Sequence, residues 1–463
     1  MDSHIICGDC LEVMRQMPDN CVDSIVTDPP AGISFMGKAW DHDKGGRDKW
    51  VAWLAAIFKE GLRILKPGGH AFVWSLPRTS HWTAFALENA GPQGAGFEIR
   101  DCVYHVFGSG FPKSLDISKA IDKQAGAERK VVGRRYAADG TPVGGRNNSV
   151  CGEGWQRPWR DRPLEEQGQA WDTAPSTLDA QRWSGWHTAL KPAVECWWLA
   201  RKPLSEKTVA ENVLRWGTGG LNIDACRIGT GDNLNGGGYS GGTPKSMFRG
   251  LDRLQPDEYR QPPGRFPANL IHDGSAEVLA GFPNTTSGGG PAIGAPRTRK
   301  NTYAEMPGIS TSLPYGCNTG SAARFFYCAK ASRAEREAGL EEVRTLFEQI
   351  EAMPKKSAPQ EYGLGDSEGQ RAPHQNAACR NNHPTVKPVA LMRYLIRLIT
   401  PPNGIVLDMF AGSGSTLVAA KELGVQWIGI EMDERYCEIA TRRTATSALS
   451  SAVVKTHTEN KCF

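Results

Sequence analysis

A glycine-rich turn near the C-terminus limits the folds that this chain can adopt. The apolar run Ile405–Leu407 leads into Asp408, and Gly412 and Gly414 follow before a helical pattern extends to about Leu423. A Rossmann-like fold uses a strand, a glycine turn and a helix start in this order to bring its backbone close to a nucleotide-sized ligand. We therefore expect an α/β fold with a ligand site at this turn.

The residues around the turn indicate what kind of ligand it accepts. No Gly-Lys-Ser/Thr follows, and the third glycine of the G-x-G-x-x-G pattern is missing. The carboxylate of Asp408 repels phosphate and suits a cationic ligand, and the aromatic Phe410 lies between it and the glycines. Glu431 ends the next apolar run, Trp427–Ile430, where a carboxylate can accept both hydrogen bonds of a ribose diol. A ribose and a cation without phosphates describe S-adenosylmethionine; a tight βα turn with a surface acid is the alternative interpretation.

A second chemical motif lies near the N-terminus. The apolar run Val22–Val26 predicts a buried strand, and Thr27, Asp28, Pro29 and Pro30 end it. The exocyclic amino group of adenine or cytosine is a poor nucleophile because its lone pair is delocalised into the ring. The Asp28 carboxylate and the rigid Pro29 carbonyl can both accept from this NH2 group and draw the lone pair back onto nitrogen. By itself, Asp-Pro-Pro is also simply a good turn.

Regular patterning elsewhere is concentrated toward the two ends of the chain. It predicts helices over Lys49–Leu65 (ended by Lys66–Gly69) and Val389–Ile399, and strands over His70–Trp74, Phe97–Phe107 and Pro192–Leu199. Strands and helices that alternate through short links are typical of a parallel sheet. The chain has 52 Gly and 30 Pro, and loop-like sequence fills much of residues 111–185, 229–265, 281–315 and 352–382.

Together, these motifs resemble those of the amino-group DNA methyltransferases. In the permuted, or beta, class of that family the Asp-Pro-Pro motif precedes an F-x-G-x-G cofactor loop. Further segments are similar to family motifs: Ile6–Cys10 to the opening strand, Leu65–Gly69 to a strand entry, and His383–Pro388 to the H-P-T-x-K-P motif. The resemblance covers residues 1–110, 187–203 and 383–445.

The resemblance implies a role for several residues. Asp28, Pro29 and Pro30 would form the catalytic motif, and Asp9 would reach the adenine of S-adenosylmethionine. The residues implied to line the remainder of the cofactor site are Thr385, Lys387, Asp408, Phe410, Gly412, Gly414 and Glu431.

One position departs from the family pattern. An aromatic residue usually follows the two prolines and stacks on the flipped base, but this chain has Ala31. Base–aromatic stacking contributes about 1–3 kcal/mol, so its loss would lower activity by about 5- to 150-fold if no other ring replaced it. Phe35 and Trp40 are candidates for that ring. Ala31 is otherwise the mark of a silenced enzyme.

Composition excludes a membrane protein, a secreted disulfide scaffold and a coiled coil. The net charge of +4, with 40% hydrophobic and 22% charged residues, indicates a soluble globular protein. No run approaches the roughly 18 apolar residues of a membrane span, and the first residues, MDSHIICGDC, contain no secretory leader. The 12 scattered cysteines indicate free thiols in the cytoplasm of a bacterial or phage-infected cell. Cys7 and Cys10 lack a second Cys pair, so we expect no metal.

The sequence as a whole predicts a three-layer α/β/α methyltransferase fold of circularly permuted motif order with loop-rich insertions. Residues 1–110 would form the catalytic half, 187–204 a return strand, 383–445 the cofactor-binding half and 446–463 a flexible tail. A basic insertion with Trp155 and Trp159 would span 111–186, and target recognition would occupy 205–382. That insertion is equally explained as a solvated loop.

The expected activity is transfer of a methyl group from S-adenosylmethionine to a base flipped out of double-stranded DNA. The motif begins with Asp28, which favours adenine N6 as the target. In the family, serine at this position is more typical of enzymes that methylate cytosine N4. A role in bacterial or phage DNA modification, such as restriction–modification, follows from the resemblance. Cytosine N4 methylation, RNA methylation, a catalytically weakened DNA-binding homologue and a homodimeric assembly remain open.

Overall fold

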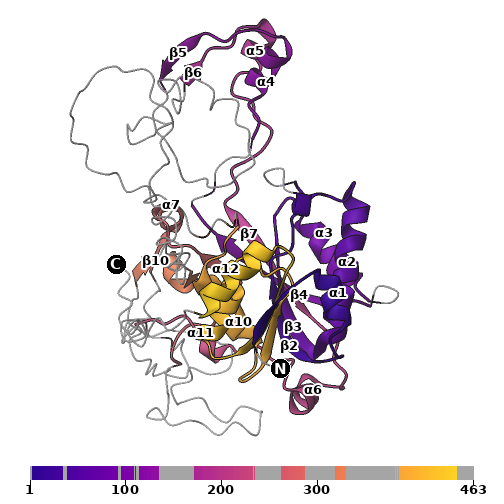
Figure 1. The fold of residues 1–463 in the computed structure, drawn as a ribbon. Helices are drawn as coiled ribbons and strands as arrows, with labels where there is room; N and C mark the ends of the chain where they lie inside the picture. Colours follow the sequence, from indigo (N-terminus) through magenta and orange to yellow (C-terminus); the bar gives the residue numbers. More distant parts are fainter. Residues whose placement is uncertain are drawn as a thin grey trace, which may run out of the picture.

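The computed structural model describes residues 3–34, 39–91, 95–108, 110, 114–134, 171–232, 234, 262–286, 319–329, 381, 383 and 385–445. Within these residues, a nine-stranded sheet combines the two ends of the chain (Figure 1). Its spatial order is β1 (His4–Cys7), β13 (Gln426–Glu431), β12 (Ile405–Asp408), β2 (Val22–Thr27), β3 (Leu65–Ser75), β7 (Val194–Arg201), β4 (Glu98–Val106), β8 (Leu270–His272) and β11 (Tyr327–Cys328). Strand β7 runs antiparallel to β3 and β4, and the other neighbouring strands are parallel.

Helices cover both faces of the sheet. Successive strand residues point to opposite faces, and Ile25 and Leu407 accordingly lie in one core cluster while Val26 and Val406 lie in the other. The first cluster packs under α1 (Cys10–Arg15), α2 (Arg47–Ile64) and α3 (Ser80–Glu88); the second packs under α10 (Val389–Ile399) and α11 (Ser415–Glu422) (Figure 1). This arrangement confirms the expected three-layer α/β/α fold.

The link predicted at Lys66–Gly69, between the helix over Lys49–Leu65 and the strand over His70–Trp74, needs a correction. Helix α2 ends at Ile64, and strand β3 begins at the next residue, so the Pro-Gly-Gly segment lies inside the strand. Gly68 has φ +76°, and the Pro67 carbonyl accepts hydrogen bonds from Asn212 Nδ2 (2.8 Å) and Thr218 Oγ1 (2.6 Å). The segment therefore forms an irregularity within β3, where the pairing with β2 shifts register.

The pairing of β12 with β2 brings the two sequence motifs together. Val406 pairs with Ser24 and Leu407 with Ile25 in a parallel register. The carboxyl ends of adjacent parallel strands lie at the same edge of a sheet, which is where α/β proteins bind ligands. Asp28 and the glycine turn consequently meet at one edge, although hundreds of residues separate them in sequence.

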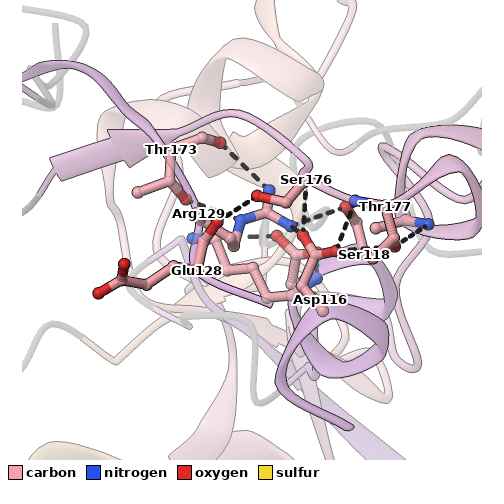
Figure 2. Close-up of polar contacts among 10 residues, drawn as sticks. Asp116, Ser118, Glu128, Arg129, Thr173, Ser176 and Thr177 are labelled. Atoms are coloured by element: carbon pink, nitrogen blue, oxygen red, sulfur yellow. Dashed lines mark hydrogen bonds and ion pairs between the residues drawn. The ribbon is translucent and has the colours of Figure 1, made fainter. Parts of the chain in front are cut away.

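A smaller unit projects from the sheet (Figure 1). It consists of α4 (Ile117–Gln124), β5 (Val131–Arg134), β6 (Trp171–Thr173) and α5 (Leu178–Arg182). The buried Asp122 carboxylate accepts from Arg129 Nη1 (2.5 Å) and from the backbone amides of Ser176 and Thr177 (both 3.0 Å). Arg129 also donates to Thr173 (Figure 2). This unit falls within the predicted basic insertion, but residues 135–170, with Trp155 and Trp159, lie outside the described residues.

The remaining elements connect or flank the sheet. They are η2 (Ala39–Asp41), α6 (Val209–Trp216), η4 (Asp224–Cys226), α7 (Ala276–Gly281), β9 (Asn284–Thr286), β10 (Thr319–Ser321), η6 (Ala322–Phe325) and α12 (Glu434–Ala445). Strands β8 and β11 come from residues 205–382, so part of that segment extends the central sheet. Among the described residues, none of the helices combines the length and apolar character needed to cross a membrane.

Candidate active site

A cavity of about 490 Å³ lies where the two motifs meet. Its volume is within the range of small-molecule binding sites. Nine of the residues predicted from the sequence line it: Asp9, Asp28, Pro30, Thr385, Lys387, Asp408, Phe410, Gly412 and Glu431. Of the other predicted residues, Pro29, Ala31 and Gly414 are not among its lining residues, and Phe35 lies outside the described part of the chain.

The glycine turn depends on backbone conformations that side chains disfavour. Gly412 has φ +52° and Gly414 has φ +79°. A Cβ atom at position 412 would lie 2.8 Å from His383 Nε2, and one at position 414 would lie 2.8 Å from the Cβ of Ala440. Both glycines are therefore required by the tight turn and by its close approach to neighbouring segments.

Glu431 is held at the cavity by backbone amides. Its Oε2 accepts from Gly412 N (2.8 Å) and its Oε1 from Asp433 N (2.9 Å). Burial raises the pKa of this carboxyl above its usual value, although these amides partly oppose the shift. Each carboxylate oxygen has capacity for a further hydrogen bond. The side chain is thus oriented in advance to accept two donors from a ligand in the cavity.

Asp408 links the two motifs. Its Oδ1 accepts from Thr27 Oγ1 (2.8 Å) and from Phe410 N (3.1 Å), and its Oδ2 accepts from Thr416 Oγ1 (2.6 Å). Thr27 directly precedes Asp28, while Thr416 lies in the first turn of α11. The buried carboxylate therefore ties the catalytic motif to the glycine turn. Burial raises its pKa to about 6, more than these hydrogen bonds lower it.

The raised pKa of Asp408 predicts a pH dependence of stability. An acid whose pKa is higher in the folded than in the unfolded state contributes stability at low pH, and this contribution is lost as pH rises from about 4 to about 6. We expect the free energy of unfolding of the wild type, relative to Asp408→Asn, to fall by about 2–3 kcal/mol across this window. Urea unfolding of both proteins at several pH values measures this difference. A difference in the free energy of unfolding that does not change with pH would contradict the raised pKa of Asp408.

Other predicted residues form the walls of the cavity. Asp9 caps helix α1 through hydrogen bonds from Leu11 N (2.9 Å) and Glu12 N (3.2 Å). The Phe410 ring lies 6.3 Å from that of Trp53, centroid to centroid. Thr385 N donates to His383 Nδ1 (3.3 Å), and the His383 ring packs edge-on against that of Tyr436.

Asp28 lies in a buried group of three charges. Lys387 Nζ is 3.1 Å from Asp28 Oδ2 and 3.7 Å from Glu195 Oε1. Burial raises the pKa of Asp28 to about 6, with Lys387 opposing the shift and Glu195 adding to it. Burial also acts to raise the pKa of Glu195, but Lys387 and His105 outweigh it and lower that pKa to about 2. The two carboxylates outweigh burial at Lys387 and raise its pKa.

The loop after Asp28 is held by a second carboxylate. Asp41 is buried, and its Oδ1 accepts from Ala31 N (2.6 Å) and Gly32 N (2.9 Å). Thr79 Oγ1 donates to the Ala31 carbonyl (3.0 Å), and the Ala31 side chain packs against the hydrophobic core. Trp40 comes from the same loop and lines the cavity. Of the two rings suggested to replace the missing aromatic, Trp40 lines the cavity, and Phe35 lies outside the described residues.

Sequence reasoning missed two carboxylates that organise this site, Glu195 and Asp41. Glu195 lies in the predicted strand Pro192–Leu199, where a charged residue in an otherwise apolar run was the available signal. Asp41 has no comparable signal because its hydrogen-bond partners are backbone amides.

Cys7 is exposed and Cys10 is buried. Among the described residues, no group of three or more His, Cys, Asp and Glu is arranged to hold a metal ion.

Known proteins match part of this chain. Residues 315–442, which include the glycine turn and Glu431, match a DNA methylase family model, N6_N4_Mtase. The putative methylase YubD of Escherichia coli K12 is 45% identical over 94 residues, which cover 20% of this chain and 37% of that protein. The type II methyltransferase M.HindIII of Haemophilus influenzae is 51% identical over 61 residues, covering 13% of this chain and 20% of that protein.

Similarity to solved structures is weaker. The PvuII cytosine-N4-specific DNA methyltransferase is 13% identical, with a TM-score of 0.41 over 98% of this chain and 90% of that one. A likeness at this level supports no conclusion about this chain. The fold and the site define a Rossmann-like protein with a nucleotide-sized cavity at the carboxyl edge of its sheet. Over residues 315–442, the chain is similar to the N4/N6 DNA methylases. It spans less than two fifths of the length of these curated relatives.

Proposed function

We propose that the chain is an S-adenosylmethionine-dependent methyltransferase acting on the exocyclic amino group of a base in DNA, with adenine N6 as the favoured target. The observation that carries this proposal is the placement of Asp28 and Glu431 in one cavity. Glu431 supplies the acceptors that a ribose diol needs, and Asp28 supplies an acceptor for an amino group. The family match and its DNA methylase relatives support the same activity.

The residues of the cavity fit S-adenosylmethionine. Five carboxylates line it (Asp9, Asp28, Asp408, Glu431 and Asp433), against two lysines, Lys44 and Lys387. Lys387 is already paired with Asp28 and Glu195. This charge balance disfavours a phosphate group and favours a cation. The aromatic rings of Trp53 and Phe410 supply an apolar wall. Asp9 and Glu431 are the residues proposed to bind the adenosine part of S-adenosylmethionine.

When bound, S-adenosylmethionine supplies an electrophilic methyl group to a nitrogen nucleophile. Asp28 accepts a hydrogen bond from the amino group of the base and localises its lone pair on nitrogen. The Pro29 carbonyl is proposed as the second acceptor, held rigid by the two prolines. The duplex hides this amino group, so the base is flipped out of the stack at a cost of a few kcal/mol.

The target base and the polymer are the finer parts of the proposal. Asp28 at the start of the motif favours adenine N6 by family tendency, and cytosine N4 is the second candidate. The projecting unit exposes Trp171, Trp183 and Trp186, which are available for contact with nucleic acid. Double-stranded DNA as the partner, with residues 111–186 and 205–382 near it, and a function in DNA modification remain predictions.

The test uses the purified full chain with methyl-labelled S-adenosylmethionine, unmethylated duplex DNA and, in parallel, RNA. Mass spectrometry of the digested nucleosides identifies the product. N6-methyladenine in DNA supports the proposal as stated, whereas N4-methylcytosine keeps the chemistry and corrects the base. Label in RNA alone overturns the DNA assignment. Cofactor binding without label on either polymer indicates a silenced homologue.

The position of Trp40 predicts its contribution to turnover. If its ring stacks on the flipped base in place of the missing aromatic, Trp40→Ala lowers kcat/KM for DNA by about 5- to 150-fold. Steady-state kinetics measure the change. Phe85→Ala, which removes an exposed ring on α3, is the control and leaves kcat/KM unchanged. Equal rates for Trp40→Ala and the wild type would contradict this role.

A further inference from the structure

The ammonium group of Lys387 is shared between two carboxylates, one just after β2 and one on β7. Asp28 follows β2 and lines the cavity, whereas Glu195 belongs to β7 and is not among the lining residues. The Lys387 ammonium lies 3.1 Å from Asp28 and 3.7 Å from Glu195, with its nitrogen 4.0 Å from the centre of the Trp74 ring. Two negative charges and one positive charge are thus enclosed together.

We propose that Glu195 is a positioning residue that draws Lys387 partly away from Asp28, so that Asp28 is free to accept a proton from the base during methyl transfer. This inference rests on the proposed function and deepens it. It assigns a role to a charged side chain that lies behind the cavity.

The chemistry requires a proton acceptor. As the amino nitrogen forms its bond to the methyl carbon, the carbon–sulfur bond breaks and its electron pair stays on sulfur. The nitrogen then carries a positive charge and one proton too many. A new O–H bond forms at Asp28 as that N–H bond breaks, and the N–H electron pair remains on nitrogen. Asp28 is the titratable group that the catalytic motif itself places in the cavity.

A lysine bound to Asp28 alone would oppose this step. A close, buried ion pair stabilises the charged carboxylate and lowers its affinity for a proton. Glu195 counteracts this effect in two ways. It provides a competing acceptor for the Lys387 ammonium, and its own negative charge disfavours the charged form of Asp28. His105 Nδ1 lies 3.7 Å from Glu195 Oε2, on the side of Glu195 that Lys387 leaves free.

Other charged groups near Asp28 remain the same when Glu195 changes. Asp408 acts on Asp28 from β12 and also favours its protonated form. The other charged or titratable side chains that face the same cavity are Asp9, Cys10, Lys44, His383, Glu431, Asp433 and Tyr436. A difference between Glu195 variants therefore reports on Glu195 and the groups it contacts.

The experiment compares Glu195→Gln, Glu195→Asp and the wild type. The rate falls at acidic pH where Asp28 becomes protonated, and removing the Glu195 charge lowers the pKa of Asp28. For Glu195→Gln we expect the acidic limb of the kcat profile to move to lower pH by about one unit. We also expect the plateau of kcat to fall about tenfold, because Asp28 becomes a weaker base. Glu195→Asp, which keeps the charge, retains the wild-type limb.

Two further measurements separate this role from a structural one. The KM for S-adenosylmethionine stays at its wild-type value because Glu195 does not line the cavity. Glu98 on β4 pairs with Arg201, which lies on β7 as Glu195 does. Glu98→Gln removes that carboxylate and leaves the acidic limb in place. An unshifted limb in an active, folded Glu195→Gln enzyme overturns the proposal.

A readout without turnover distinguishes failure of this inference from failure of the proposed function. Aspartate labelled with ¹³C at its carboxyl carbon reports the titration of Asp28, assigned by its absence in Asp28→Asn. A downward shift of this titration in Glu195→Gln supports the inference even if the wild type methylates neither polymer. Methylation by the wild type with an unchanged Asp28 titration overturns the inference and leaves the function intact.

Discussion

Replacement of Asp28 by alanine is expected to lower kcat for methyl transfer by about 10²- to 10³-fold. The side chain lies in the cavity, and Lys387 Nζ is 3.1 Å from its Oδ2. Without the carboxylate, the amino group of the base loses the acceptor that localises its lone pair, and the proton released after transfer has no acceptor in the motif. Single-turnover kinetics with saturating S-adenosylmethionine measure the chemical step directly.

Binding measurements show whether this loss is chemical. Asp28 is proposed to contact the base and not the ribose, so the Kd for S-adenosylmethionine should stay near that of the wild type in Asp28→Ala. Asp28→Asn keeps a carbonyl acceptor but cannot take a proton, and its rate should lie between those of alanine and aspartate. Asp48→Ala, at an exposed aspartate of α2, serves as the matched control. A wild-type rate in Asp28→Ala would remove the catalytic assignment.

Glu431→Ala is expected to raise the Kd for S-adenosylmethionine by about 10²- to 10⁴-fold. Hydrogen bonds to a charged acceptor contribute about 1.5–3 kcal/mol, and the ribose diol would lose both of its bonds. The change also releases the amides of Gly412 and Asp433, which are now held at 2.8 and 2.9 Å. Quenching of tryptophan fluorescence measures the affinity, because Trp40 and Trp53 line the cavity.

A nearby glutamate outside the cavity provides a control for this prediction. Glu434 lies in the first turn of α12 and is not among the cavity-lining residues, so Glu434→Ala should leave the Kd unchanged. Glu431→Gln keeps one acceptor oxygen in a side chain of the same size and should show a smaller increase than Glu431→Ala. An unchanged Kd in a folded Glu431→Ala protein would show that the ribose does not bind there.

Short-range patterns predicted the elements that hold the site. Apolar runs placed β2, β12 and β13 within one or two residues of their observed bounds, and α10 coincides with its predicted range. These signals are local, because burial and helix periodicity act on neighbouring residues. The Lys66–Gly69 segment misled the prediction, since the contacts of Asn212 and Thr218 with Pro67 keep it within β3.

The sequence by itself determined the chemistry that is proposed for this protein. Asp28 with its two prolines, the glycine turn and Glu431 were identifiable because each occurs in a short segment with a recognisable purpose. Their order along the chain also indicated the permuted family. The α/β fold followed from the same segments, since a strand and a glycine turn before a helix restrict the backbone locally.

Only the tertiary structure decided which charges surround Asp28. Lys387 and Glu195 reach it because β2 and β7 lie on either side of β3 and because the segment before α10 crosses the same edge. Asp408 turned out to link the two motifs through Thr27 and Thr416, a role that depends on the pairing of β12 with β2. Distances between such remote residues are set by strand order and packing, and no local pattern records them. Burial in that packed setting then shifts the pKa values on which the proposed proton transfer depends.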